Sequence, residues 1–196
     1  PRIGVFICHC GGNISDIVNV DELKKFLSDL DNVVAYDYRF VCSNDGQKLI
    51  KAKIQEEGLE GIVVACCTPK MYEEMFRGVA KEAGMNPFVV EIANVREQCS
   101  YPHWYEPEKA PEKAKYIVRS LVEKVRLLEP LESIEAEVHP GVAVIGAGVA
   151  GMHAALQLAD IGHKVYLIEK SPTIGGNMAR LVKTFPTDDC ATCTLG

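Results

Sequence analysis

The chain is 196 residues long, so it has room for one complete domain and part of a second. Hydrophobic residues make up 47% and charged residues 24%, the composition of a globular protein that can bury a sizeable core. A formal net charge of −6 argues against a general nucleic-acid binder, which would present a basic face.

Apolar runs alternate with amphipathic segments through the first two thirds of the chain. The runs predict strands at Ile3–Cys8, Val33–Val41, Gly61–Ala65 and Phe88–Ala93. Helices are expected over Asp21–Leu30, from Ser43 to Gly58, from Thr68 to about Gly84, and from about Ala110 to Leu128. This alternation predicts an α/β fold with a doubly wound parallel sheet, Rossmann or flavodoxin-like, and right-handed crossovers.

Local residues mark several of these boundaries. Ser43 is a natural N-cap, Gly58 suits the end of the same helix, and Thr68-Pro69 is an N-cap followed by a proline in the first helical position. The acidic segment Glu129–Pro140, which contains Pro130, indicates a linker. We therefore expect residues 1–135 to form an N-terminal cysteine-rich domain and residues 141–196 to begin a second domain.

A dinucleotide-binding βαβ unit is predicted from Val142 to Glu169. Gly146 permits the tight turn after the first strand, Gly148 lets backbone N–H groups approach a pyrophosphate, and Gly151 lets the helix pack on the strand. Glu169 follows the second strand, where an acid accepts hydrogen bonds from a ribose hydroxyl and disfavours NADP. The alternative is a glycine-rich turn that binds no ligand. A membrane span over this segment is not expected, because the segment contains several glycines.

A second glycine pair selects the nucleotide. Gly175 and Gly176 follow the acid after a short loop, an arrangement that resembles FAD-binding Rossmann proteins, in which this pair approaches the cofactor again. We therefore expect FAD rather than NAD. Because the fold needs several more strands, we also expect this chain to be the N-terminal part of a longer polypeptide and not to be active alone.

Cysteine is the unusual component of the chain, with eight residues. We expect no signal peptide, so the thiols point to metal or redox chemistry in a reducing cytoplasm rather than to disulfides. Every predicted strand of the first domain is followed by cysteine, and these residues are Cys8, Cys10, Cys42, Cys66, Cys67 and Cys99. The carboxyl ends of parallel strands share one edge, so the thiols should converge there and hold a 4Fe-4S cluster or zinc.

Not all of these cysteines need be ligands. Cys8 and Cys66 still lie within apolar runs and are expected to be ordinary buried residues. Cys190 and Cys193 form a separate CxxC, which suits either a redox dithiol or half of a metal site. A cluster at this pair would need ligands from elsewhere.

Motifs along the whole chain resemble those of one subunit type, the A subunit, of the heterodisulfide reductases of methanogenic archaea and their relatives. They are ICHCGG (Ile7–Gly12), CSNDGQ (Cys42–Gln47), CCTP (Cys66–Pro69), NVREQCS (Asn94–Ser100), LLEPLE (Leu127–Glu132), GAGVAG (Gly146–Gly151), IGGNMA (Ile174–Ala179) and FPTDDCATC (Phe185–Cys193).

The resemblance implies a cytoplasmic subunit that carries FAD on a thioredoxin-reductase-like domain together with several iron–sulfur clusters. It implies subunits B and C of heterodisulfide reductase as partners, which reduce the heterodisulfide of coenzymes M and B, and it allows a homodimer in the complex. Electrons would come from a hydrogenase, formate dehydrogenase or deazaflavin-oxidising partner. In several members the flavin splits electron pairs, with ferredoxin as the second acceptor.

Carried over to this sequence, the FAD contacts are Gly146, Gly148, Gly151, Glu169, Gly175 and Gly176. The strand-end argument makes Cys10, Cys42, Cys67 and Cys99 the first-choice cluster ligands, with Cys190 and Cys193 for a second cluster. Two other functions stay open. One is a pyridine-nucleotide disulfide oxidoreductase with a Cys190/Cys193 dithiol, and the other is a zinc-stabilised module that docks subunits.

Overall fold

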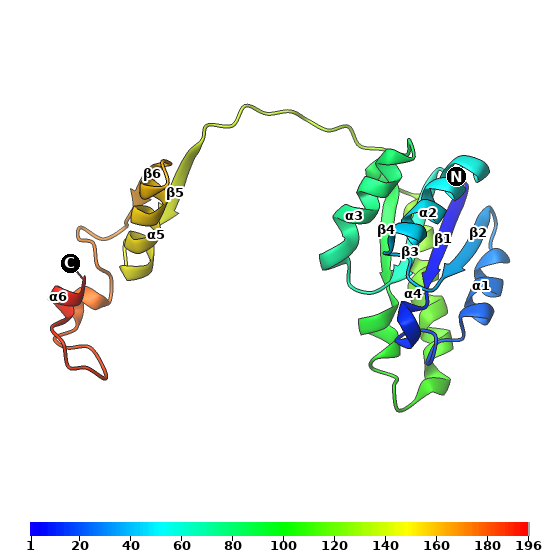
Figure 1. Cartoon of the computed structure of the whole chain (residues 1–196), viewed down its shortest axis with the longest axis horizontal. Helices are drawn as coiled ribbons and strands as arrows, with labels where there is room; N and C mark the ends of the chain where they lie inside the picture. The colour runs from blue at the N-terminus through cyan, green and yellow to red at the C-terminus, as the bar shows by residue number, and fades with distance from the viewer. Residues whose placement is uncertain (196) are drawn as a thin grey trace. The chain divides into compact units, whose positions relative to one another are not determined.

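The structure is a computed structural model that describes residues 1–195 of the chain. It contains two compact units, Pro1–Ser133 and a second that begins at Ile134 (Figure 1). Residues 128–140 form neither helix nor strand. Gly196, the last residue of the predicted second domain, lies outside the described residues.

The N-terminal unit is built on one parallel sheet, as predicted. Its strands are β1 (Ile3–Cys8), β2 (Val33–Tyr38), β3 (Gly61–Cys66) and β4 (Val90–Asn94). They lie in the order β2-β1-β3-β4, which is the order of the first four strands of flavodoxin-like sheets. The chain therefore runs outward from β1 in one direction and then returns to add β3 and β4 on the other side.

Four helices connect and follow these strands. They are α1 (Val20–Ser28), α2 (Asn44–Glu57), α3 (Pro69–Glu82) and α4 (Ala110–Arg126). The predicted caps are confirmed: the Ser43 hydroxyl accepts a hydrogen bond from Gly46 N at 3.2 Å, and Gly58 ends α2 with a φ of 59°. Thr68 caps α3, with Pro69 at its first position.

Two predicted strand boundaries were wrong. The second strand ends at Tyr38 rather than Val41, because Tyr38 pairs with Cys8 and β1 offers no partner beyond that point. The fourth strand starts at Val90 rather than Phe88, because Pro87–Val89 forms a short 3-10 turn that the Asn86 side chain caps.

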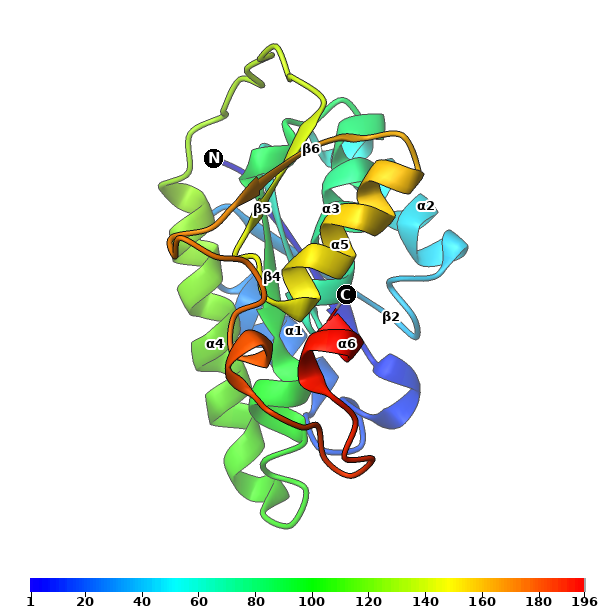
Figure 2. The ribbon, with the colours of Figure 1, turned by 90° about the vertical axis from the view of Figure 1, so that its left-hand side faces the viewer.

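The sheet separates two apolar cores. Alternate residues of β1 face opposite sides, so Val5 and Ile7 pack with α1 and α4, whereas Phe6 and Cys8 pack with α2 and α3. Figures 1 and 2 show α4 along one side of the sheet and α2 and α3 on the other. The unit is thus a doubly wound three-layer domain, as the sequence predicts.

The second unit contains the predicted βαβ element. Its parts are β5 (Gly141–Ile145), α5 (Val149–Asp160) and β6 (Lys164–Ile168), with the two strands paired in parallel. A short helix, α6 (Ala191–Leu195), contains Cys193. In the described part of the chain, no helix combines the length and the apolar character needed to cross a membrane.

Candidate functional site

The carboxyl edge of the N-terminal sheet collects most of the predicted thiols. Cys8 is the last residue of β1 and Cys66 the last of β3, while Cys10 and Cys67 follow in the adjacent loops. The strand order reverses direction between β1 and β3, which is where doubly wound sheets open a crevice for ligands. We call Cys8, Cys10, Cys42, Cys66 and Cys67 the strand-end thiols.

The loop after β1 has an unusual backbone that directs Cys10. Cys10, Gly11 and Gly12 all have positive φ values, of 54°, 63° and 111°. Such a conformation strains Cys10, which has a Cβ, and such strain concentrates at functional sites. A Cβ at Gly11 would lie 2.9 Å from the Phe40 ring, and one at Gly12 would lie 2.9 Å from an Asp16 carboxylate oxygen. The loop therefore requires both glycines.

The strand-end thiols influence one another's protonation. Burial, together with the neighbouring Cys10 and Cys42, raises the pKa of Cys8 to about 11. Burial and then Cys67 raise the pKa of Cys42. The pKa of Cys67 is instead lowered to about 7, chiefly by the adjacent Cys66 thiol, which donates to Cys67 O at 3.6 Å, and also by the nearby Arg96. The edge thus holds one thiol that ionises readily beside others that resist ionisation.

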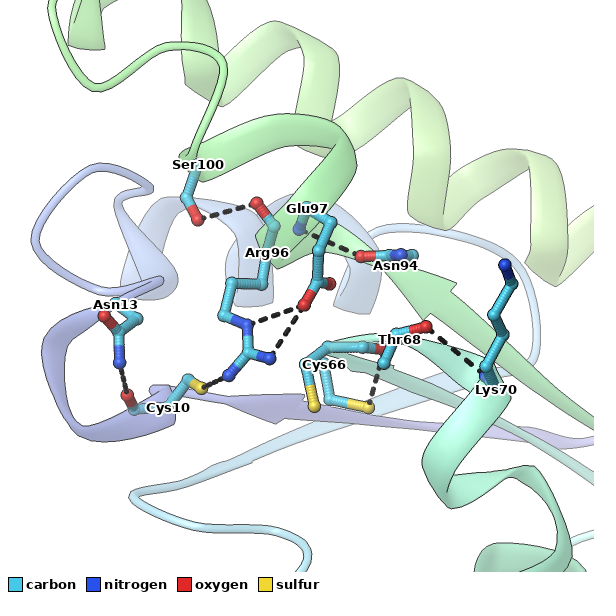
Figure 3. Close-up of polar contacts among 10 residues, drawn as sticks. Cys10, Asn13, Cys66, Thr68, Lys70, Asn94, Arg96, Glu97 and Ser100 are labelled. Atoms are coloured by element: carbon cyan, nitrogen blue, oxygen red, sulfur yellow. Dashed lines mark hydrogen bonds and ion pairs between the residues drawn. The ribbon is translucent and has the colours of Figure 1, made fainter. Parts of the chain in front are cut away.

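Arg96 brings a permanent positive charge to this edge, and the sequence prediction missed it (Figure 3). Its Nη1 donates to Cys10 Sγ at 3.3 Å, while Nε and Nη2 donate to Glu97 Oε1 at 2.9 and 2.7 Å. The guanidinium carbon also lies 5.6 Å from the centre of the Tyr101 ring. Arg96 follows β4 by two residues, a position at the carboxyl edge of the sheet that the sequence alone indicates.

Cys99 occupies a different environment from the strand-end thiols. It lies in the wide helical turn Arg96–Ser100 and is fully buried among the side chains under α4. Its thiol donates a hydrogen bond to Ala110 O at 3.2 Å. Burial raises the pKa of this thiol. Cys67 and Cys10 thus lie near enough to Cys42 to raise the pKa of its thiol, whereas Cys99 lies in the core. The ligand role of Cys99 stays a prediction.

The arrangement of donors bears on which metal group they suit. Among residues 1–195, no three Cys, His, Asp or Glu side chains lie close enough together to hold one metal ion. Thiolates bind both groups, a single zinc ion at about 2.3 Å and an iron–sulfur cluster over several iron atoms. Which of the two the strand-end thiols hold stays a prediction.

The first glycine loop of the second unit has the shape that a pyrophosphate requires. Gly146 has a φ of 98°, and a Cβ at Gly151 would lie 1.8 Å from Gly146 O, so the start of α5 packs directly on the turn. Gly148 is the N-cap of α5, and no other described atom lies within 4 Å of the position that a Cβ would occupy there. The backbone N–H groups at the start of α5 are therefore approachable by an anion.

The second glycine pair packs on the first loop. Gly175 and Gly176 have φ values of 100° and 56°, and Gly175 N donates to Ala147 O at 2.7 Å. A Cβ at Gly176 would lie 3.1 Å from the Gly148 Cα. The two glycine motifs, separated in the sequence by a helix and a strand, thus form one continuous backbone surface.

Glu169 ties the same loops together. Its Oε2 accepts from Ala147 N at 2.7 Å and its Oε1 from Ser171 N at 2.8 Å. These hydrogen bonds from Ser171 and Ala147 lower the pKa of Glu169 to about 2, so the side chain is ionised at neutral pH. A hollow of about 340 Å³ lies beside it, lined by Ile145, Gly146, Ile168, Glu169 and Lys170.

The CxxC pair lies on the surface of the second unit. Cys190 pairs with Lys183 in an isolated antiparallel bridge, and Cys193 lies one turn later in α6. Both side chains are exposed. Their predicted role in a second cluster stays a prediction.

Comparison with known proteins relates both units to redox proteins. The family model described as FAD dependent oxidoreductase matches residues 141–191. Over 196 residues the chain is 54% identical to a protein of Archaeoglobus profundus that is named as similar to the A subunit of heterodisulfide reductase, covering 100% of this chain and 28% of that relative.

Two further relatives come from methanogens. The identity is 54% with the first iron–sulfur A subunit of the CoB–CoM heterodisulfide reductase of Methanopyrus kandleri, over 99% of this chain and 29% of the relative. It is 50% with the A subunit of the H(2):CoB-CoM heterodisulfide,ferredoxin reductase of Methanothermobacter marburgensis, over 100% of this chain and 30% of the relative. The chain thus spans less than a third of the length of these curated relatives.

Proposed function

Because the chain belongs over its whole length to the family of heterodisulfide reductase A subunits, we propose that it forms the N-terminal part of an electron-transfer protein that carries FAD and an iron–sulfur cluster. The observation that carries this proposal is the placement of thiols at the carboxyl edge of the first sheet, where β1 and β3 end in Cys8 and Cys66 and Arg96 Nη1 donates to Cys10 Sγ at 3.3 Å. The glycine loops and Glu169 of the second unit support the flavin.

Each group has a defined part of this chain to hold it. Gly146, Gly148 and Gly151 would cradle the pyrophosphate at the start of α5, and Gly175–Gly176 would close over the same loop. The ionised Glu169 orders both loops and would accept a ribose hydroxyl. When bound, FAD can exchange electrons in pairs or singly, whereas an iron–sulfur cluster takes them one at a time.

The cluster would be ligated by Cys10, Cys42 and Cys67, with Cys99 as the fourth candidate. The pKa of Cys67 is lowered, which favours its thiolate, and the positive charge of Arg96 offsets the negative charge of thiolates at this edge. For Cys99 to ligate, its bond to Ala110 O would have to break and its side chain would have to leave the core. Cys190 and Cys193 would contribute to a second cluster with ligands from outside this chain.

The substrate and partners follow from the relatives. Their names include a CoB–CoM heterodisulfide reductase and an H(2):CoB-CoM heterodisulfide,ferredoxin reductase, so we assign the heterodisulfide of coenzymes M and B and ferredoxin to the whole protein. Subunits B and C, together with a hydrogenase, formate dehydrogenase or deazaflavin-oxidising donor, complete the proposed complex, which can include a second copy of this protein. The free thiols of the first unit suit a reducing cytoplasm.

Metal analysis of the anaerobically prepared chain tests the cluster. We expect about four irons and four sulfides per chain, with an iron–sulfur EPR signal after reduction. Cys42→Ser should lose both. Cys8→Ser is the matched control and should leave the iron content unchanged, since Cys8 is buried at the end of β1 and a serine hydroxyl can still accept the hydrogen bond that Cys8 Sγ accepts from Cys10 N. Stoichiometric zinc, or thiols without metal, would overturn the cluster and favour the docking module or the dithiol enzyme.

A further inference from the structure

The contacts of Arg96 assign it a specific orientation. The edge of its guanidinium formed by Nε and Nη2 is occupied by Glu97 Oε1, and the plane lies near the Tyr101 ring. Nη1 lies outside this pair of bonds and donates to Cys10 Sγ at 3.3 Å. Figure 3 shows the guanidinium between Glu97 and Cys10. An arginine on a loop would otherwise have many rotamers, so these contacts preorganise its charge.

The backbone beneath Arg96 is also held in place. Glu97 N donates to the Asn94 side chain at 3.0 Å, and the Ser100 hydroxyl donates to Arg96 O at 3.1 Å. The side chains of Arg96 and Glu97 are only 24% and 33% exposed, so water screens their charges incompletely. Glu97 Oε2 is buried and accepts no hydrogen bond within residues 1–195. Within the described residues, the Glu97 carboxylate thus accepts its side-chain hydrogen bonds from Arg96, through Oε1.

We propose that Arg96 is a positioning residue that sets the reduction potential of the iron–sulfur cluster at the strand-end thiols. This proposal rests on the proposed function, since it requires a cluster bound through Cys10. Reduction adds one negative charge to a cluster, and a fixed cation beside a ligand sulfur stabilises the reduced state more than the oxidised one. Hydrogen bonds to the sulfurs and local charge are two means by which proteins adjust such potentials.

The test compares cluster potentials by EPR-monitored redox titration of the anaerobically prepared chain. Arg96→Gln keeps hydrogen-bond donors but removes the charge, and we expect it to disfavour reduction by about tenfold, which is about 59 mV more negative for one electron. Glu97→Gln removes the opposing charge while its amide oxygen can still accept from Arg96, so it should shift the potential in the positive direction. Arg96→Lys should keep the potential close to that of the parent chain.

Arg77→Gln is the matched control. Arg77 also pairs with a glutamate, Glu73, and lies 5.6 Å from an aromatic ring, that of Phe88, but it is on α3 and contacts no thiol among the described residues. Its loss removes the same charge and the same kinds of contact and should leave the potential unchanged.

The outcomes separate this proposal from the function on which it rests. A parent chain without iron would overturn both. A parent chain with a cluster whose potential does not change in Arg96→Gln, or changes equally in Arg77→Gln, would overturn only the role of Arg96. If Arg96→Gln loses its iron, Arg96→Lys decides: restored iron at the parental potential supports the role of the charge, and loss of iron there as well makes Arg96 merely structural.

Discussion

Arg96 and Cys10 are 86 positions apart in the chain, yet Arg96 Nη1 donates to Cys10 Sγ at 3.3 Å. The contact joins the loop after β1 to the loop after β4, although β3 lies between these strands in the sheet. It therefore spans the edge at which the strand-end thiols gather.

A side chain at Gly11, in the loop after β1, should destabilise the protein. Gly11→Ala places a Cβ at a φ of 63° and 2.9 Å from the Phe40 ring. We expect a loss of about 1–3 kcal/mol in the free energy of unfolding, measured by urea denaturation. Gly78→Ala is the control, because Gly78 lies within α3 and nothing approaches its Cβ position within 4 Å. That change should stabilise the chain by about 0.5–1 kcal/mol.

Two glycines of the first glycine loop, Gly148 and Gly151, should respond differently to substitution by alanine. Gly151→Ala would place a Cβ 1.8 Å from Gly146 O and should lower both the thermal midpoint and the flavin content. Gly148→Ala enters space that is open in the structure, so it should leave the midpoint nearly unchanged while obstructing the pyrophosphate. Flavin absorbance and thermal denaturation of the same preparations measure the two effects. Equal flavin content in Gly148→Ala and the parent protein would contradict the assigned cradle.

Cys67 should ionise near neutral pH in the metal-free chain. Its pKa is lowered to about 7, chiefly by the adjacent Cys66 thiol. Thiolate ultraviolet absorbance should therefore show a transition near pH 7 that Cys67→Ser abolishes. Cys66→Ala removes that thiol and should move the transition to higher pH. A transition that stays in place in Cys66→Ala would show that the Cys66 thiol is not its cause.

Glu169 should stabilise the second unit in a defined pH range. Its pKa falls from 4.5 to about 2 because Ser171 N and Ala147 N donate to the carboxylate in the folded state. The stabilisation is complete above the unfolded pKa and is lost as the pH falls from about 5 towards 2. Glu169→Gln should thus lower the thermal midpoint at pH 7 but make little difference near pH 2. Glu137→Gln, in the exposed segment before β5, serves as the control.

The CxxC pair offers a direct comparison between cluster and dithiol chemistry. If Cys190 and Cys193 form a catalytic dithiol, Cys190→Ser should abolish disulfide reduction and leave the visible iron–sulfur absorption unchanged. If the pair ligates a second cluster, the same change should reduce the iron content of the complete protein. We expect the second result, with the strand-end cluster retained, as measured by iron analysis and EPR.

Several elements could be predicted because their causes are local. Ser43 and Thr68 cap the following helices through hydrogen bonds to residues two or three positions ahead, and Gly58 adopts the left-handed conformation that most residues avoid. The ends of β2 and β4 were predicted less well. They depend on where β1 stops offering a partner and on the turn at Pro87.

Some features of the candidate site could likewise be predicted from the sequence, and others depend on the tertiary structure. The sequence by itself determined the parallel α/β class, the presence of cysteine after each strand of the first sheet, and the glycines of the flavin loops, since each follows from apolar runs or from the backbone needs of single residues. Only the tertiary structure decided that Arg96 faces Cys10 and that Cys99 turns into the core under α4. Those orientations depend on the order of strands in the sheet and on the packing of α4, which join residues far apart in the chain.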